Sequence, residues 1–437
     1  MKKNSVDIVT WSRRAKGARV EAFLKRPAVD PAAERTAREV LDDIRLRGDS
    51  AVRDWMKRFE KRAPAAGEWR VTPEALAAAG ARTDAAFRRA AAEAHRRIRA
   101  FAKAGLRKNW RLDDGHGARL GERFVPYDRV GVYVPGGAAP LASTVLMTVT
   151  LAKTAGVREI VACTPAGPDG QVNPYVLYVL KLAGATEVYR VGGIQAIGLM
   201  AYGTGSVLKV QKIVGPGGAF VTAAKKLVYG EVALDSVAGP SEIAVLADGE
   251  ANPAFVAADL LSQAEHGTGH EKALLVTTSR ALAAAVRREL MSQAAGLGRC
   301  EAIAEVMRRG GILFAVTKTL EEGAELCNAF APEHLELMIR RPERLLPRIT
   351  RAGAVFLGPW TPECVGDYAA GPSHVLPTGG TAALFSGLTV NDFTRRISVV
   401  KYSRAALKRA WPVIEAFGRV EGLDAHAASG KMRLTRS

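Results

Sequence analysis

The stretch Val132-Tyr133-Val134-Pro135-Gly136-Gly137 carries a short apolar strand into a glycine-rich turn. The same order of strand, glycine turn and helix returns at Arg190-Val191-Gly192-Gly193-Ile194-Gln195 and at Ile213-Val214-Gly215-Pro216-Gly217-Gly218. Strands that alternate with helices pair in parallel, because each helix carries the chain back to the same edge of the sheet. We therefore expect an α/β fold with parallel-sheet cores.

Each of these turns is expected to present backbone N–H groups at a helix N-terminus. Such ends bind phosphate or another anion, because the first helical amides lack partners within the helix and the helix dipole adds positive potential. None of the three turns matches the pattern G-x-G-x-x-G, and glycines also serve simply to make tight turns. The repetition of the pattern favours a nucleotide site.

The same alternation continues beyond residue 238, so the chain is predicted to form two Rossmann-like α/β domains with a site in the cleft between them. The strands expected in this second block are residues 241–247, 273–278, 312–316 and 354–357. We predict a mainly helical N-terminal section (1–128), a first α/β domain (129–237), a second α/β domain (238–386) and a C-terminal arm (387–437). The arm is too small to have much core of its own, so it is expected to pack on the main body or on a second subunit.

Composition indicates an ordinary globular protein of 437 residues with 48% hydrophobic side chains. No apolar run reaches the roughly 18 residues that span a bilayer, and the first residues lack the apolar core of a signal peptide. We expect a cytoplasmic protein without a membrane role. The four cysteines are scattered, without a C-x-x-C pair, and are expected to be reduced thiols that are mostly buried.

A formal charge of +18 raises the question of nucleic-acid binding. The basic residues are dispersed along the chain, however, and lack the interleaved aromatic residues of single-strand binders. We therefore expect no nucleic-acid partner. An anionic cofactor would gain modestly from the positive field.

Two further motifs carry the chemistry. In Asp259-Leu-Leu-Ser-Gln263-Ala-Glu-His266-Gly267, side chains three apart lie on one face of a helix that is expected to end at His266, so Gln263 and His266 are placed to bind one metal ion or ligand. Ala331-Pro-Glu333-His334 sets a carboxylate beside an imidazole after a proline that suggests a fixed turn. These side chains are well suited to proton transfer near neutral pH.

A third segment, Gly366-Asp367-Tyr368 through His374, is rich in glycine and proline and is expected to form a constrained loop. Gln263, His266, Asp367 and one further histidine would make a nitrogen and oxygen ligand set suited to zinc. Each residue also has a structural interpretation: His266 complements the end of its helix, Asp367 caps a turn, and His426 lies on a mobile tail. His95, His116 and His270 are expected to be solvated residues outside the site.

The chain resembles the histidinol dehydrogenase family along nearly its whole length. The motifs that carry the resemblance are Gly131-Val-Tyr133-Val-Pro-Gly-Gly, Val191-Gly-Gly-Ile-Gln195, Ala238-Gly-Pro-Ser241-Glu, Ser262-Gln263-Ala-Glu-His266, Pro332-Glu333-His334-Leu, Gly366-Asp367-Tyr, His374-Val-Leu-Pro-Thr and Glu421-Gly-Leu-Asp-Ala-His426. The resemblance implies a cytoplasmic homodimer of intertwined chains. It further implies a zinc- and NAD-dependent enzyme that oxidises L-histidinol to L-histidine through L-histidinaldehyde with two NAD⁺, the final steps of histidine biosynthesis.

The resemblance also implies roles for single residues. Glu333 and His334 are the catalytic bases, and the first α/β domain binds NAD through Tyr133, Gln195 and the position of Gly218. The implied zinc ligands are Gln263, His266, Asp367 and His426, the last supplied by the other subunit so that the two active sites are shared. The implied substrate-binding residues are Ser241, Gln263, His266, His334, Asp367, His374, Glu421 and His426.

One position departs from the family pattern, because the asparagine that usually follows Gly-Pro-Gly is Gly218 here. Loss of one ordinary hydrogen bond to NAD would cost about 0.5 to 1.5 kcal/mol. A related zinc- and NAD-dependent dehydrogenase of another polar alcohol, for example a sulfonated one, is the alternative, but Glu421 fits a cationic amine better than an anionic head group. A metal- or nucleotide-binding regulator without turnover would be expected to lack Glu333 or His334.

Overall fold

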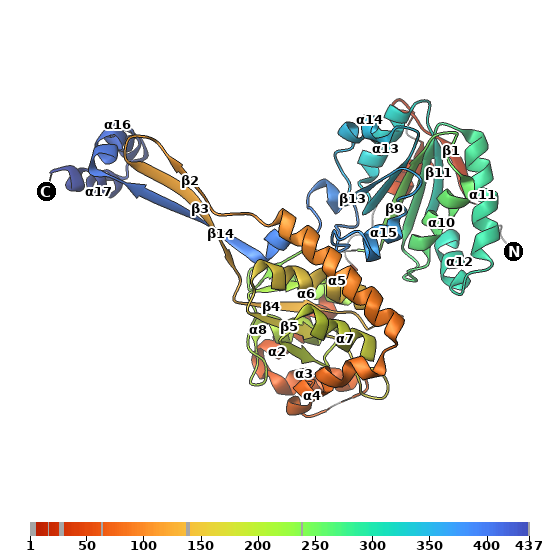
Figure 1. Cartoon of the computed structure of the whole chain (residues 1–437), viewed down its shortest axis with the longest axis horizontal. Helices are drawn as coiled ribbons and strands as arrows, with labels where there is room; N and C mark the ends of the chain where they lie inside the picture. Colours follow the sequence, from red (N-terminus) through yellow and green to blue (C-terminus); the bar gives the residue numbers. More distant parts are fainter. Residues whose placement is uncertain are drawn as a thin grey trace.

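The computed structural model describes residues 6–15, 17–25, 30–62, 64–136, 140–236 and 239–435. Gly137 of the first glycine turn, Ala238 of the third family motif and the predicted domain boundary at residues 237 and 238 lie outside these residues. Two α/β bodies lie side by side, and a long arm reaches away from them (Figure 1). The chain has the predicted α/β architecture, with two parallel sheets and a third, antiparallel one. Among the described residues, no helix is long and apolar enough to cross a membrane.

The first parallel sheet has five strands in the order β6-β5-β4-β7-β8. Its strands are β4 (Arg129–Tyr133), β5 (Glu159–Cys163), β6 (Glu187–Tyr189), β7 (Lys212–Val214) and β8 (Ala233–Leu234). The chain runs outward from β4 to β6 and then returns to β7 on the other side of β4, so the strand order reverses between β4 and β7. In open parallel sheets, ligands bind in the crevice at the carboxyl ends of the two strands that flank such a reversal.

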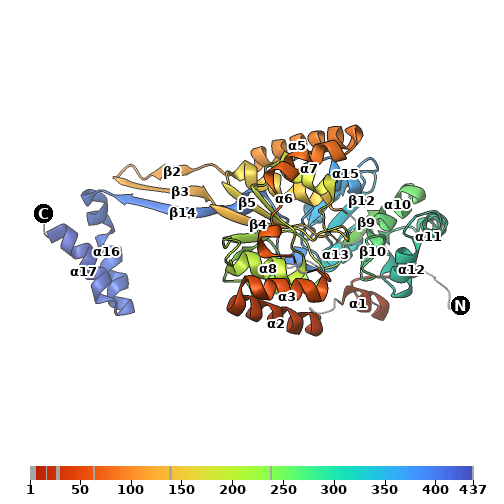
Figure 2. The same ribbon diagram turned by 90° about the horizontal axis from the view of Figure 1, so that it is seen from below.

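Helices cover both faces of this sheet, and a separate buried core lies on each face. One face carries α5 (Ala85–Gly105), α6 (Ala142–Ala155) and α7 (Pro174–Ala183). The other carries α2 (Pro31–Arg47), α3 (Asp49–Phe59), α8 (Gly193–Tyr202) and α9 (Ala219–Leu227). Figure 2 shows these two layers above and below the strands. The short elements of the same region are η1 (Ala66–Glu68), α4 (Pro73–Ala78) and η2 (Ala79–Arg82).

The second parallel sheet has six strands in the order β1-β11-β10-β9-β12-β13. Its strands are β1 (Asp7–Thr10), β9 (Glu242–Ala247), β10 (Lys272–Thr277), β11 (Ile312–Val316), β12 (His334–Met338) and β13 (Ala354–Leu357). The amino-terminal strand β1 pairs with β11, so the N-terminal section contributes an edge strand to this sheet. Here the strand order reverses between β9 and β12.

Helices again cover both faces of the second sheet. On one face lie α10 (Pro253–Ala264), α11 (Arg280–Ala294) and α12 (Cys300–Arg308), and on the other α1 (Ala18–Leu24) and α13 (Leu320–Phe330). The remaining elements are α14 (Pro342–Leu345), η3 (Leu346–Arg348), α15 (Glu363–Tyr368), η4 (Thr381–Ala383) and η5 (Val390–Phe393).

The arm is a three-stranded antiparallel sheet with two helices at its tip (Figure 1). Its strands are β2 (Trp110–Asp113), β3 (Ala118–Pro126) and β14 (Thr394–Tyr402), followed by α16 (Arg404–Glu421) and α17 (Asp424–Thr435). β14 pairs with β3 along nine residues, from Thr394 opposite Pro126 to Tyr402 opposite Ala118. Two of the three arm strands therefore come from residues before 128, which a C-terminal arm of residues 387–437 alone does not include.

Candidate active site

The segment Ala331 to His334 is held in one conformation by the backbone around it. Ala331 ends α13 in a left-handed conformation with φ 45°, which turns the chain into β12. On the neighbouring strand, the N–H of Gly353 donates to the carbonyl of Pro332, and the N–H of Ala354 donates to that of Glu333 at 2.9 Å. Glu333 and His334 therefore sit, buried, at the amino end of β12.

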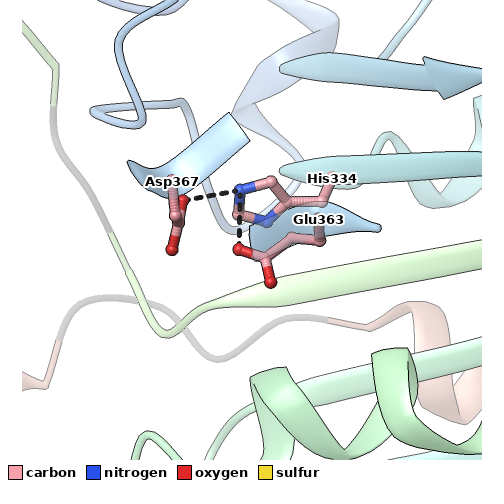
Figure 3. A group of neighbouring side chains, drawn as sticks. All are labelled: His334, Glu363 and Asp367. Atoms are coloured by element: carbon pink, nitrogen blue, oxygen red, sulfur yellow. Dashed lines mark ion pairs between the residues drawn. The ribbon is translucent and has the colours of Figure 1, made fainter. Parts of the chain in front are cut away.

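Three contacts orient the imidazole of His334. Its Nδ1 lies 3.3 Å from the carbonyl oxygen of Glu242 on β9, which makes Nδ1–H the donor and leaves Nε2 unprotonated. Nε2 points toward two carboxylates, at 3.8 Å from Oε1 of Glu363 and 3.9 Å from Oδ1 of Asp367 (Figure 3). The Glu333 carboxylate accepts a hydrogen bond from the backbone N–H of Glu242 at 3.1 Å. His334 thus presents a proton-accepting nitrogen to a group of acidic side chains.

Burial shifts the pKa of every titratable side chain in this group. It lowers the pKa of His334 to about 3 and that of His374 to about 4, so both imidazoles are neutral at pH 7. It raises the pKa of Glu333 well above its usual value, that of Asp367 to about 6 and that of Glu363 to about 8, the last with help from the neighbouring Asp367 charge. Crowded, desolvated carboxyl groups of this kind favour a proton or a metal cation among them.

Gln263 and His266 approach the same group from α10. The helix ends at Ala264, two residues earlier than predicted, and His266 lies in the turn that follows, where its N–H donates to the Gln263 carbonyl at 3.3 Å. The Gln263 side chain is 1% exposed, and neither amide atom has a hydrogen-bond partner among the described residues. His266 Nδ1 lies 3.1 Å from Oγ of Ser241.

Asp367 and His374 connect the group to the first sheet. Asp367 lies in the short helix α15, whereas the sequence suggested a loop. His374 Nδ1 lies 3.2 Å from the carbonyl oxygen of Asp367, and its Nε2 lies 3.4 Å from Oγ1 of Thr144 on α6. A cavity of about 170 Å³ lined by His334, Phe356, Asp367 and His374 adjoins these side chains. The group therefore lies where the two α/β bodies meet.

Sequence reasoning missed Glu363. Ligand atoms of His334, Glu363 and Asp367 all lie within 4.8 Å of one another, which makes them a group that can hold a metal ion. The spacing of Glu363 and Asp367, four apart, places them on one face of a helix, and this signal was available in the sequence. Ser262 of α10 donates to the other Glu363 oxygen at 3.1 Å.

Comparison with known proteins bears on this geometry. A family model described as histidinol dehydrogenase matches residues 24–434. The chain is 45% identical over 398 residues to the histidinol dehydrogenase of Heliobacterium mobile, covering 91% of this chain and 93% of the relative. It is also 45% identical to that of Gluconobacter oxydans, with 92% of each chain covered. The chain belongs to the histidinol dehydrogenase family.

A solved structure agrees with this assignment. The crystal structure of histidinol dehydrogenase from Elizabethkingia anophelis superposes with a TM-score of 0.92 at 34% identity and covers 98% of each chain. Members of the histidinol dehydrogenase family are NAD-dependent oxidoreductases of histidine biosynthesis, and this chain is such an enzyme.

The residues implied to contact NAD lie at the carboxyl edge of the first sheet. Tyr133 ends β4, and its hydroxyl accepts the N–H of Gly193 at 3.1 Å. Gln195 is buried in the first turn of α8. Gly218 caps α9, and a Cβ placed on it would meet nothing within 4 Å, so the asparagine common in the family has room here.

Two implied site residues lie elsewhere. Glu421 ends α16 and His426 lies on α17, both exposed at the tip of the arm and separated from the His334 group by the length of the arm (Figure 1). A single chain therefore does not bring these two residues to Gln263, His266 and Asp367. The cysteines also differ from expectation, because Cys163 and Cys327 are buried but Cys300 and Cys364 are exposed.

Proposed function

We propose that this enzyme oxidises L-histidinol to L-histidine through L-histidinaldehyde, using two NAD⁺ and a zinc ion. The observation that carries the proposal is the buried, neutral His334, whose free Nε2 faces the Glu363 and Asp367 carboxylates where the two bodies meet. A proton acceptor in this place can take the hydroxyl proton of an alcohol, and an NAD⁺ bound at the carboxyl edge of the first sheet can accept the hydride.

The zinc ligands proposed are Gln263, His266, Asp367 and His426 of the partner subunit. The buried amide of Gln263, which has no hydrogen-bond partner in the described part of the chain, and the raised pKa of Asp367 support a cation at this place. Glu363 adjoins the same position. When bound, zinc would supply the charge that fixes the amine and imidazole of the amino alcohol.

We propose a homodimer because the arm of a single chain exposes many apolar side chains. The exposed apolar side chains of β14 and of the segment that carries α16 and α17 are Ile397, Val399, Val400, Tyr402, Val413, Phe417, Val420, Leu423 and Met432. A patch of this kind favours an interface with another surface. An apolar cavity of about 410 Å³ between α5 and α6 reaches Asp367 and Tyr368, which offers a place beside the site for the partner's arm.

The chemistry is divided between adjacent bases. In the first half reaction, His334 Nε2 takes the hydroxyl proton as hydride leaves the carbon for NAD⁺, which gives the aldehyde and NADH. In the second, Glu333 takes a proton from water as it adds to the aldehyde. His334 then takes the hydroxyl proton of the hydrate while a second hydride leaves. One histidinol, two NAD⁺ and one water thus yield histidine, two NADH and protons.

Ser241, His374 and the partner's Glu421 are proposed to bind the substrate together with the metal ligands and His334. Ser241 is already placed against His266, and His374 against Asp367. A carboxylate from the partner's Glu421 suits the substrate amine.

The ratio of NADH formed to histidinol consumed tests the proposed function. We expect two NADH per histidinol, with histidine as the product identified by mass spectrometry. One NADH per substrate with a released aldehyde or ketone would instead identify a dehydrogenase that stops after a single oxidation. This result would favour the alternative function, a related dehydrogenase of another polar alcohol.

A further inference from the structure

Glu60 occupies one of the three glycine turns that the sequence offered as phosphate sites. It follows α3 directly, and its Oε1 accepts the N–H of Gly192 at 3.2 Å, at the start of α8. The same oxygen accepts Nε2 of Gln195 at 3.3 Å. A carboxylate therefore already satisfies the amide at this helix end, and it would repel a phosphate placed there. The β6 turn is not a phosphate site.

This leaves the turns after β4 and β7 for the pyrophosphate of a dinucleotide. These two strands flank the reversal of strand order, where ligands bind in sheets of this type. Gly215 in the β7 turn packs so closely on Tyr133 that an added Cβ would lie 2.2 Å from the Tyr133 carbonyl oxygen. Gly215 of the β7 turn thus lies directly beside Tyr133 at the end of β4.

The two faces of the first sheet indicate which way the cofactor lies. The group that contains His334 and His374 lies beside the α6 face, because Thr144 of α6 contacts His374. The nicotinamide must reach that side for hydride transfer. Glu60 follows α3 and Gln195 lies on α8, and both helices pack on the opposite face (Figure 2). The adenosine end therefore lies toward Glu60.

We propose that Glu60 selects NAD over NADP by accepting a hydrogen bond from an adenosine ribose hydroxyl and by repelling a 2′-phosphate. This inference rests on the proposed NAD contacts of Tyr133 and Gln195. An acidic side chain that accepts the ribose hydroxyl is a general device for this choice. The guanidinium of Arg62 donates to the carbonyl of Gly167 at 3.2 Å. Burial raises the pKa of Glu60, and the hydrogen bond from Gly192 and the charge of Arg62 act in the opposite direction.

Calorimetric titration of the dimeric, zinc-loaded enzyme with NAD and NADP tests the proposal without turnover. The parent should bind NAD at least about 100-fold more tightly than NADP. Glu60→Gln should weaken NAD binding by about 10-fold, the usual effect of losing one hydrogen bond to a charged group. The ratio of the affinities for NAD and NADP should fall by at least the same factor. Glu60→Asp keeps the charge and should still exclude NADP.

Glu39→Gln is the matched control, because it removes the same charge from an exposed position on α2 and should leave both affinities unchanged. Circular dichroism and zinc content report whether each variant is folded. If Glu60→Gln does not fold, the parent is titrated with ADP-ribose and with its 2′-phosphate, and a preference for ADP-ribose of at least about 100-fold is expected.

Two results overturn the proposal in distinguishable ways. If the parent binds NAD and the folded Glu60→Gln variant keeps the same preference for NAD over NADP, Glu60 does not select the cofactor. Equal affinity of the parent for ADP-ribose and for its 2′-phosphate would also contradict the role of Glu60. Neither result contradicts the proposed NAD site. A parent that does not bind NAD contradicts the proposed NAD site itself.

Discussion

At the scale of single residues, the adjacent pair Glu333 and His334 have different surroundings. His334 is held by the Glu242 carbonyl with its free nitrogen toward Glu363 and Asp367, whereas Glu333 is held by the Glu242 N–H. The sequence predicted both as bases, because carboxylate and imidazole are the usual proton carriers. It did not predict which way each one points, since that depends on β9, a strand about ninety residues away in the chain.

Glu333→Gln should separate the two half reactions. The amide keeps the shape but loses the base that activates water, so oxidation of supplied histidinaldehyde should fall by about 10²- to 10⁴-fold. Alcohol oxidation, measured as NADH formed with the aldehyde trapped, needs no water and should fall much less. His334→Asn should impair both steps. Equal losses in the two steps for Glu333→Gln would refute this division of labour.

Gln263→Met should have opposite effects on stability and on metal binding. The buried amide has no partner among the described residues, which costs about 1 to 3 kcal/mol in the metal-free protein. An apolar side chain of similar length should therefore raise the melting temperature of the chelated enzyme while lowering its zinc affinity. An unchanged zinc affinity would show that the amide is not a metal ligand, and a lowered melting temperature would show that it stabilises the metal-free fold.

At the scale of elements, the sequence predicted the alternation of strands and helices but not which sheet edge carries the site. The glycine turns lie at the carboxyl edge of the first sheet, as the pattern indicated. Glu333 and His334, in contrast, lie at the amino edge of the second sheet, where the end of α10 also brings Gln263. Motif order along the chain does not encode this, because it depends on how the two bodies face each other.

The ends of short elements were also beyond sequence reasoning. Gly267, with φ +87°, follows the turn that ends α10, so the helix stops before His266. Asp367 was expected on a loop because glycines and prolines surround it, yet six residues form α15 there. Local composition predicts that a segment is constrained, whereas contacts from other elements decide its conformation.

The acidic group around α15 predicts how the stability of the metal-free enzyme depends on pH. The pKa of Glu363 is raised from 4.5 to about 8, so the folded chain keeps a proton that the unfolded chain releases above pH 4.5. Stability from this group is full below pH 4.5 and is lost as the pH rises to about 8. His334 and His374 have lowered pKa values and reduce stability only below about pH 6.5.

Between pH 6.5 and 8, the melting temperature of the chelated enzyme should therefore fall, with a loss of about 1 to 2 kcal/mol from Glu363 alone. The zinc-loaded enzyme should change much less, because a cation stabilises the ionised carboxylates. Scanning calorimetry at three pH values provides the comparison. A metal-free melting temperature that stays level or rises over this range would contradict the assigned protonation.

At the scale of the whole molecule, the arm decides whether the site is complete. Its sheet joins β2 and β3 to β14, which lies about 270 residues later in the chain. Local sequence patterns do not predict pairing between strands so far apart in the chain. The resemblance implied a partner's His426 and Glu421, and in the single chain both residues lie at the tip of the arm (Figure 1). We therefore propose that each site takes its last ligands from a second chain.

Subunit exchange between two inactive variants tests this claim most directly. His426→Ala removes the ligand that a chain contributes to its partner's site, and His266→Ala removes a ligand of the chain's own site. Each homodimer should therefore have almost no activity. In a mixed dimer, one site combines the intact body of the His426→Ala chain with the intact arm of the His266→Ala chain. Histidinol-dependent NADH formation should then return to about a quarter of the parent rate, since half the dimers are mixed and each has one working site. If mass spectrometry verifies the exchange and no activity returns, His426 does not act across the dimer.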